Sequence, residues 1–465
     1  MVRVAPDIIP PQPILQPVAA SGDMEPPGDE LSPAQEQAMW EEIQRNIAAL
    51  RARGALAAPD AAQTVTYDFP LRLAPGLPDY AGFRVSAFVD HNPASGSVLD
   101  YNGGTRTYDG HRGTDYALYP FNWNKVNAGE VQVIAAAAGT IVGKANVDPT
   151  DHNPCDGGSS SDPWNYVALV HADGRMTIYG HMRYNSLTTK GIGQTVIAGE
   201  YLGTAASSGN SSGPHLHFEV RFGSFSTNEW FDPYAGPNSQ PESLWTSQRP
   251  YYDSAINKLA THAAPPSTPD PCQPSITNLQ DSFTPPGNIY FYTYYRDYQG
   301  ALATQFTIYK PNGDIFQTWS YTSATAFASA WNYGRVFAFT SNEPAGTWRF
   351  EATYNGHVYE TFFNVIGLVA RDDFAMTPIN TPITLDILGN DEIPAGEPLT
   401  ITVGLPLSGT VSLINAHTVY TPTLDFLGTD VFTYTVRTST EQADATVKVL
   451  VAAKVYHSFL PLIQR

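Results

Sequence analysis

The stretch SSGPHLHFEVRF, residues 211–222, has the composition of a β-strand that carries two histidines. Side chains alternate between the two faces of a strand, so His215, His217 and Glu219 are expected on one face, with the intervening apolar side chains on the other. One face should therefore pack into a core while the opposite face presents two imidazoles. What these imidazoles can do depends on the partners that the rest of the chain supplies.

A first partner motif lies about a hundred residues upstream, in HRGTD at residues 111–115. His111 and Asp115 stand four residues apart, a spacing that two metal ligands can use but that is also common among loop residues. Zinc accepts histidine and carboxylate ligands together, and a catalytic zinc site keeps three protein ligands and one open position. The pair alone does not decide between these readings.

A second partner comes from NYVALVHADGRMTIYGHM, residues 165–182, which predicts a β-hairpin that turns at residues 172–175. Its second strand is expected to bring Thr177, Tyr179 and His181 out on one side. Each of the three motifs is weak alone, because short histidine patterns are common. Their succession in one domain is more specific.

This succession resembles the lysostaphin- and LytM-type zinc endopeptidases, which act on peptidoglycan, over roughly residues 105–235. VIAAAAGTIVG, TVIAGEYLGTAASSGNSSGPHLHFEV and FDPYAG resemble that family's framework as well. The resemblance implies that His111, Asp115 and His217 are zinc ligands and that His181 and His215 are the catalytic pair. It leaves open which of the pair activates water and which stabilises the oxyanion.

The chain departs from the family pattern at VDPTDHNPCDGGSSSDPWN, residues 147–165, where a longer loop precedes the hairpin. This loop replaces the position from which a substrate-contacting tyrosine would be assigned. The peptide bond that is cleaved, and whether the target is the cell's own or a foreign wall, therefore stay open.

Composition limits the other classes of function. A net charge of −19, with 25 basic against 44 acidic residues, argues against nucleic acid as a partner. The 37 glycines and 38 prolines favour turns and a mainly β fold. Two cysteines, Cys155 and Cys272, are too few for a disulfide framework, and they can form one bridge or two thiols. We find no apolar run long enough to span a membrane and no recognisable signal peptide.

The expected architecture is an antiparallel β-sheet peptidase domain followed by two β-sandwich modules, with one N-terminal amphipathic helix. The helix is predicted from Ser32 as N-cap, with Pro33 and Gln35 in its first turn and Gly54 after its end, and it should pack on a neighbouring domain. The expected divisions are a disordered Pro-rich leader and helix (1–61), the peptidase domain (62–237), a linker (238–274), a β-sandwich (275–366), an immunoglobulin-like module (367–453) and a tail (454–465).

The last module resembles the cadherin-like and immunoglobulin-like modules of bacterial surface proteins, through RDDFAMTPINTPITLDILGND and GTDVFTYTV. Its acidic turns suggest a possible calcium site, with acidic surface turns as an equal alternative. The candidate ligands are Asp372, Asp373, Asn390, Asp391 and Asp430.

The resemblance thus implies a zinc-dependent endopeptidase that hydrolyses peptide bonds in peptidoglycan stems or cross-bridges and acts outside the cell or in the cell envelope. The alternatives are a catalytically silent protein that binds the wall or regulates another hydrolase, and an adhesive surface protein. A silent relative would be expected to lose ligands, whereas all five positions are filled here. The sequence leaves the oligomeric state open.

Overall fold

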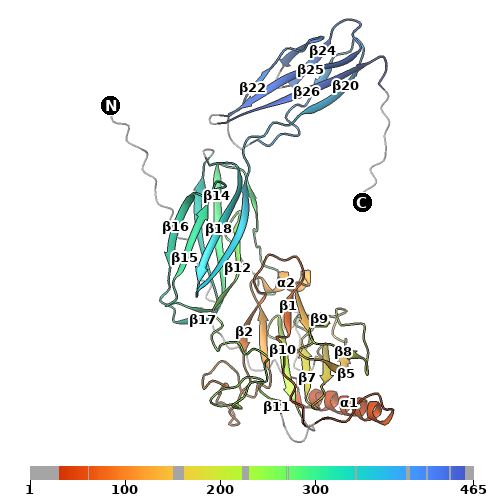
Figure 1. The fold of residues 1–465 in the computed structure, drawn as a ribbon, viewed down its shortest axis with the longest axis vertical. Coiled ribbons are helices and arrows are strands. Elements are labelled where there is room, and N and C mark those ends of the chain that lie inside the picture. Colours follow the sequence, from red (N-terminus) through yellow and green to blue (C-terminus); the bar gives the residue numbers. More distant parts are fainter. Residues whose placement is uncertain are drawn as a thin grey trace.

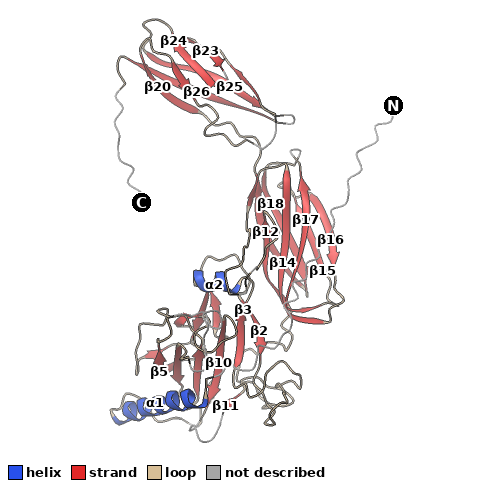
Figure 2. Cartoon of the chain, turned by 180° about the vertical axis from the view of Figure 1, so that it is seen from behind, coloured by secondary structure: helices blue, strands red, loops and turns tan. Residues whose placement is uncertain are grey.

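The computed structural model describes residues 31–60, 62–149, 162–222, 230–268, 270, 272–340, 343–393, 398–414, 417–438 and 441–455. Three bodies follow one another along the long axis (Figures 1 and 2). The described chain is mainly β, as predicted, with mainly antiparallel sheets. The expected leader and tail, and Cys155, lie outside the described residues.

The first body holds both helices of the described chain, one more than predicted, and its sheet runs in the order β2-β3-β10-β7-β6-β5-β8 with β11 on β10. A smaller sheet, β1-β4-β9, lies beside it. The elements are α1 (Pro33–Ala52), β1 (Leu71–Leu73), β2 (Phe83–Ala87), β3 (Thr114–Leu118), α2 (Asn122–Ala128), β4 (Val131–Ile134), β5 (Gly139–Ala145), β6 (Tyr166–Val170), β7 (Met176–Gly180), β8 (Thr195–Val196), β9 (Tyr201–Thr204), β10 (His215–Arg221) and β11 (Trp230–Phe231).

The large sheet is covered on both faces. One face packs on the main core, which includes Leu216, Phe218 and Tyr179. The other face carries α1, whose apolar side chains pack on Ile178, Tyr166 and neighbouring side chains of the sheet. This apolar stripe consists of Trp40, Ile43, Ile47 and Leu50. The capping box of Ser32 and Gln35 forms as predicted. The helix thus packs on the first body, as the sequence predicts for a helix beside a neighbouring domain.

The second body is a sandwich of two sheets, β12-β14-β17 and β13-β19-β18-β15-β16. Its strands are β12 (Ala255–His262), β13 (Ser282–Phe283), β14 (Gly287–Gln299), β15 (Thr304–Tyr309), β16 (Ile315–Tyr321), β17 (Phe327–Phe339), β18 (Gly346–Tyr354) and β19 (His357–Val365). The predicted linker is wrong for residues 255–262, because β12 pairs with β14 along its length. It is also too long at its start, since Leu244 and Trp245 are buried in the core of the first body.

The third body is a smaller sandwich with sheets β20-β26-β25-β22 and β21-β24-β23. Its first strand pairs in parallel with its last, from Asp373 opposite Val447 to Pro378 opposite Ala452. The strands are β20 (Asp373–Pro378), β21 (Ile383–Leu385), β22 (Thr400–Val403), β23 (Gly409–Ile414), β24 (His417–Pro422), β25 (Gly428–Arg437) and β26 (Gln442–Ala452).

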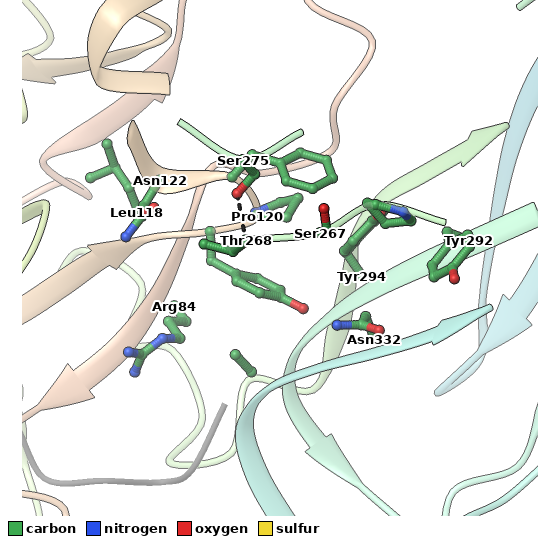
Figure 3. Close-up of a pocket in the computed structure, with 14 residues that line it drawn as sticks. Arg84, Leu118, Pro120, Asn122, Ser267, Thr268, Ser275, Tyr292, Tyr294 and Asn332 are labelled. Atoms are coloured by element: carbon green, nitrogen blue, oxygen red, sulfur yellow. Dashed lines mark hydrogen bonds between the residues drawn. The ribbon is translucent and has the colours of Figure 1, made fainter. Parts of the chain in front are cut away.

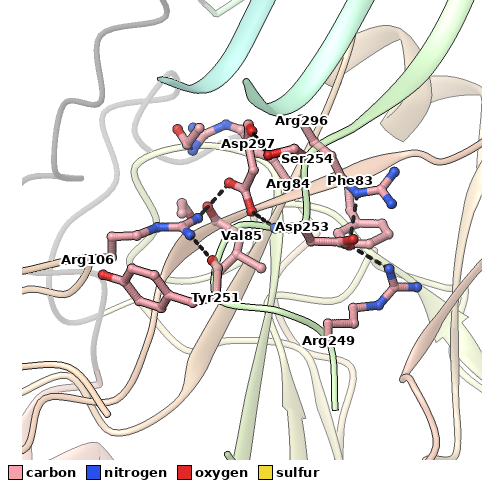
Figure 4. A network of polar contacts seen from close by, with 12 residues as sticks. Phe83, Arg84, Val85, Arg106, Arg249, Tyr251, Asp253, Ser254, Arg296 and Asp297 are labelled. Carbon is pink, nitrogen blue, oxygen red and sulfur yellow. Dashed lines mark hydrogen bonds and ion pairs between the residues drawn. The ribbon is translucent and has the colours of Figure 1, made fainter. Parts of the chain in front are cut away.

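The first two bodies are joined by a network of partly buried polar groups (Figure 4). The Arg106 guanidinium donates to the carbonyl oxygens of Val85 and Tyr251, at 3.0 and 2.5 Å, and pairs with Asp297 of the sandwich at 2.7 Å. The carboxylate of Asp253 pairs with both Arg249 and Arg296. Beside this interface lies a cavity of about 300 Å³, lined by residues of both bodies such as Tyr119 and Tyr294 (Figure 3). The first body and the sandwich are therefore packed together rather than loosely tethered.

Candidate metal centre

The centre is built on β10, whose two neighbours supply the other strand-borne groups. Asp115 of β3 lies directly opposite His217, and Gly180 of β7 lies opposite it on the other side. Because side chains alternate, His215, His217 and Glu219 share the face that α1 also covers, as the sequence predicts. Two strands far apart in the sequence thus bring a carboxylate and an imidazole together.

His111 completes a group of three from the loop before β3. Its Nε2 atom lies 3.1 Å from Asp115 Oδ2 and 3.4 Å from His217 Nδ1, and His217 Nδ1 lies 2.8 Å from Asp115 Oδ1. Ligand atoms at about 2.0–2.1 Å from a tetrahedral zinc ion would be about 3.3 Å apart. The residues present therefore fit a zinc ion, and His111, Asp115 and His217 are one of two groups close enough to hold a metal among the described residues.

The second group consists of His181, His215 and His217, so His217 is common to both. The ring centroids of His181 and His215 are 4.4 Å apart. His215 Nε2 lies 3.6 Å from Asp115 Oδ1. All five predicted site residues are thus brought together in one place.

The alternation of side chains along β7 does not explain why His181 faces the centre. The expectation that Thr177, Tyr179 and His181 share one side was wrong, because Tyr179 packs against Phe218 in the core on the opposite face. His181 follows the end of β7 with a positive φ of 55°. This left-handed residue turns the imidazole onto the face that carries His215.

Each histidine has one ring nitrogen engaged away from the centre, which leaves the other nitrogen directed inward. The outer partners are the Phe88 carbonyl for His111 Nδ1 (2.6 Å), the Ser208 carbonyl for His181 Nδ1 (2.6 Å), the Gly213 carbonyl for His215 Nδ1 (2.7 Å) and the Glu219 carboxylate for His217 Nε2 (2.9 Å). The inward nitrogen is consequently Nε2 in three of the rings and Nδ1 in His217.

The centre is fully buried, with side chains of His111, Asp115, His215 and His217 at 0% exposure and His181 at 1%. The Nε2 atoms of His181 and His215 are buried and have no hydrogen-bond partner among the described residues. Burial and the neighbouring imidazoles hold the pKa of His181 well below its ordinary value, so its ring is neutral. For Asp115, burial would raise the pKa, but the surrounding histidines outweigh it and keep the carboxyl ionised.

Two close contacts fix the rings in position. A Cβ atom on Gly113 would lie 2.7 Å from His217 Nε2, so only glycine leaves room for that ring. A Cβ atom on Gly180 would lie 2.2 Å from the Trp164 ring, whose centroid is 5.5 Å from that of His217 and 5.1 Å from that of His181. Trp164 therefore forms a wall of the centre.

Sequence reasoning missed the charged residues behind the centre, Glu36, Arg112 and Arg221. Arg221 pairs with Glu36 at 2.7 Å. Arg221 also contacts Glu219, and Glu36 also contacts Arg112. The available signal was the position of Glu36 on α1, four residues before Trp40 and seven before Ile43, within the apolar stripe. A charge in that stripe requires a buried partner.

The predicted calcium residues do not form such a centre. Asp430 is buried and accepts hydrogen bonds from the Leu407 and Ser408 amides and the Tyr420 hydroxyl. Asp391 accepts from Tyr434 at 2.9 Å, Asp372 accepts from the Thr446 amide, and Asn390 donates to the Asp372 carbonyl. Asp373 has its pKa raised to about 6 by burial and by Asp391. The hydrogen bonds of these residues are made within their own module, and the expectation of calcium is not supported.

None of the helices in the described ranges combines the length and the apolar character that crossing a bilayer requires.

Comparison with known proteins gives two family matches, "Peptidase family M23" over residues 110–233 and "Bacterial Ig domain" over residues 367–450. The "Cell division protein DipM" of Caulobacter vibrioides is 36% identical over 90 residues, which are 19% of this chain and 12% of that protein.

Among solved structures, the catalytic domain of lysostaphin from Staphylococcus simulans is 24% identical, with 32% of this chain and 89% of that chain covered and a TM-score of 0.22. A putative peptidase M23 from Pseudomonas aeruginosa is 18% identical, with 42% and 59% covered and a TM-score of 0.20. On the family matches, the chain contains a domain of peptidase family M23 at residues 110–233 and a bacterial Ig domain at residues 367–450.

Proposed function

We propose that the first body is a zinc-dependent endopeptidase that hydrolyses peptide bonds in peptidoglycan. The observation that carries the proposal is the convergence of four imidazoles and one carboxylate, which form two overlapping groups with ligand atoms close enough to hold a metal ion. The family match supports a peptidase. The same family match supports peptidoglycan as the substrate, and together with the bacterial Ig domain it supports a location in the cell envelope or outside the cell.

His111, Asp115 and His217 would hold the metal. Of the two groups, this one includes a carboxylate and has the ligand spacing of a tetrahedral zinc site. Bound zinc supplies Lewis acidity, which makes water a competent nucleophile near neutral pH.

His181 and His215 would carry the proton transfers. Their Nε2 atoms face the centre, and the carbonyl bonds on their Nδ1 atoms fix each ring with Nδ1 as donor. A neutral ring with a free Nε2 lone pair can accept a proton from water, and the same ring in its protonated form can donate to the substrate carbonyl oxygen or to the leaving amine. The two rings lie side by side, so each can serve one part of the reaction.

The test uses the full chain and purified peptidoglycan sacculi. We expect about one zinc per chain by elemental analysis, and release of soluble fragments that carry new amino groups, because an endopeptidase opens amide bonds. New reducing sugar ends would indicate cleavage of glycan instead. A chelator should stop the release and added zinc should restore it, while His217→Ala should lack both metal and activity. Zinc binding without new amino groups would favour a silent wall-binding protein and contradict the proposal.

A further inference from the structure

The ring of His217 is held by a carboxylate rather than by a backbone carbonyl, unlike the other three histidines of the centre. Glu219 Oε1 lies 2.9 Å from His217 Nε2, and Glu219 is 1% exposed. This contact places the hydrogen on Nε2, so Nδ1 is the unprotonated nitrogen that faces the centre. A carboxylate buried to this degree needs a cationic partner to be stable in its charged form.

That partner is Arg221, which lies two residues further along the same face of β10. Its Nε atom contacts Glu219 Oε2, and its terminal nitrogen pairs with Glu36 Oε1 of α1 at 2.7 Å. The guanidinium also lies over the ring of Trp40, 5.8 Å from its centroid. Arg221 is therefore enclosed by two carboxylates and by one turn of α1.

Glu36 has a second cationic partner, because its Oε2 atom contacts the guanidinium of Arg112. Arg112 directly follows His111 in the chain. One carboxylate on α1 thus connects the segment that carries His111 with the strand that carries His217. The four groups, Glu36, Glu219, Arg112 and Arg221, have a net charge of zero.

The position of Glu36 is not explained by the helix alone. An acidic residue in the first turn interacts favourably with the helix dipole, and it does so equally well when its side chain faces solvent. Glu36 instead lies in the apolar stripe and is 5% exposed, where an unpaired charge would be costly. Its environment fits a role toward the sheet below it.

We propose that Glu36 is a positioning residue for the metal centre: it holds Arg221 and Arg112, and through Glu219 it fixes the orientation and basicity of His217. This inference rests on the proposed zinc site. Without the negative charge of Glu36, Arg221 would interact more strongly with Glu219. The four charged groups would also have a net charge of one positive unit, which opposes the binding of a divalent cation. Helix α1 then helps to position the metal ligands.

The test measures zinc affinity in the full chain, by competition with a chromogenic chelator, together with the melting temperature of the metal-free protein. Glu36→Gln keeps the shape and removes the charge, and it should raise the zinc dissociation constant by about ten- to a hundredfold. The matched control is Asn46→Ala, which removes a 2.9 Å bond from α1 to the Val142 carbonyl at a site without charge. This control should lower the melting temperature without changing zinc affinity.

The double variant Glu36→Gln/Arg112→Gln restores a neutral group and should recover part of the lost affinity, which a merely structural role would not predict. Should Glu36→Gln fail to fold, Glu36→Asp keeps the charge with a shorter reach and should give an intermediate dissociation constant. Wild-type affinity in folded Glu36→Gln, or an equal loss in Asn46→Ala, would overturn the inference alone. Absence of zinc from the wild-type chain would overturn the proposed function and this inference with it.

Discussion

His215 and His217 stand two residues apart on β10, yet they present different ring nitrogens to the centre. The Gly213 carbonyl engages Nδ1 of His215, whereas the Glu219 carboxylate engages Nε2 of His217. His217 consequently directs the ring atom nearer the backbone to the centre and lies beside Asp115, and His215 extends past it toward His181. The outer hydrogen bonds therefore give two residues of one type two different orientations at the centre.

This separation predicts distinct defects. His215→Ala and His181→Ala should keep about one zinc per chain and lose turnover by on the order of a hundredfold or more, because they remove a proton-transfer group and no ligand. His111→Ala should lose the metal. The readouts are zinc per chain and the release of amino groups from sacculi, on one preparation of each variant.

His171 provides the matched control, because it is a buried histidine of the same body that binds the Ala138 carbonyl and Thr177. Folded His171→Ala should retain zinc and turnover. Zinc loss in His215→Ala would instead make His181, His215 and His217 the ligand group.

The five residues of the centre could be selected from the sequence because short motifs carry them. Which ring nitrogen of each histidine faces the centre could not be predicted. It depends on hydrogen bonds to backbone carbonyl groups in loops, such as those of Phe88 and Ser208. His181 shows the limit of periodicity, since one residue with positive φ reverses the face to which it points. Glu36 could not be placed, because its partners lie far along the chain, Arg112 in the loop before β3 and Arg221 on β10.

At the scale of elements, the contact between α1 and β5 depends on Gly143. A Cβ atom at this position would lie 2.8 Å from Ile43 Cγ1 of the helix and 3.0 Å from the Tyr166 ring. The missing side chain lets the helix approach the sheet closely, and the same approach lets α1 reach the charged residues behind the centre. The sequence predicted this helix, its capping box and its apolar stripe, because those signals are local.

Gly143→Ala should lower the free energy of unfolding of the first body by about 1–3 kcal/mol, as expected for overpacking. Ile43→Ala alone should cost about 2–5 kcal/mol through the cavity it leaves. In the double variant the added methyl group enters that cavity, so the combined loss should be smaller than the sum of the two. Denaturant unfolding followed by tryptophan fluorescence reports on this contact, since Trp40 and Trp164 lie in it.

Gly191→Ala is the control for the effect of an added methyl group, because its nearest neighbour would be 3.9 Å away. It should change the free energy of unfolding little. Strictly additive losses in the Gly143 and Ile43 variants would show that the two residues are not in contact.

At the scale of the molecule, β12 links the first body to the second through a buried asparagine. The side-chain nitrogen of Asn257 donates to the carbonyl oxygens of Phe83 and Tyr119, at 2.7 and 3.0 Å, and its side-chain oxygen accepts from Arg296 at 2.9 Å. The sequence suggested a proline-marked linker here because prolines follow at residues 265–274. Pairing of β12 with β14 is a tertiary contact and gives no local signal.

Asn257→Ala should leave two buried carbonyl groups unpaired, at a cost of about 1–3 kcal/mol each. Because the group lies between both bodies, calorimetry should show their unfolding shift to lower temperature together, while the bacterial Ig domain keeps its own transition. Asn312→Ala, in an exposed turn of the same sandwich, should shift neither. A shift confined to one of the two bodies would show that they unfold independently.

The parallel pairing of β20 with β26 has a mechanical consequence. The chain enters the bacterial Ig domain at one end of this pair and leaves it at the other, with six residue pairs in register between them. Tension applied through the two ends acts along the strands, so the hydrogen bonds between them are loaded in shear and must yield together. A hairpin pulled at its open end would instead lose its bonds one after another. The six residue pairs between β20 and β26 would therefore resist such tension together.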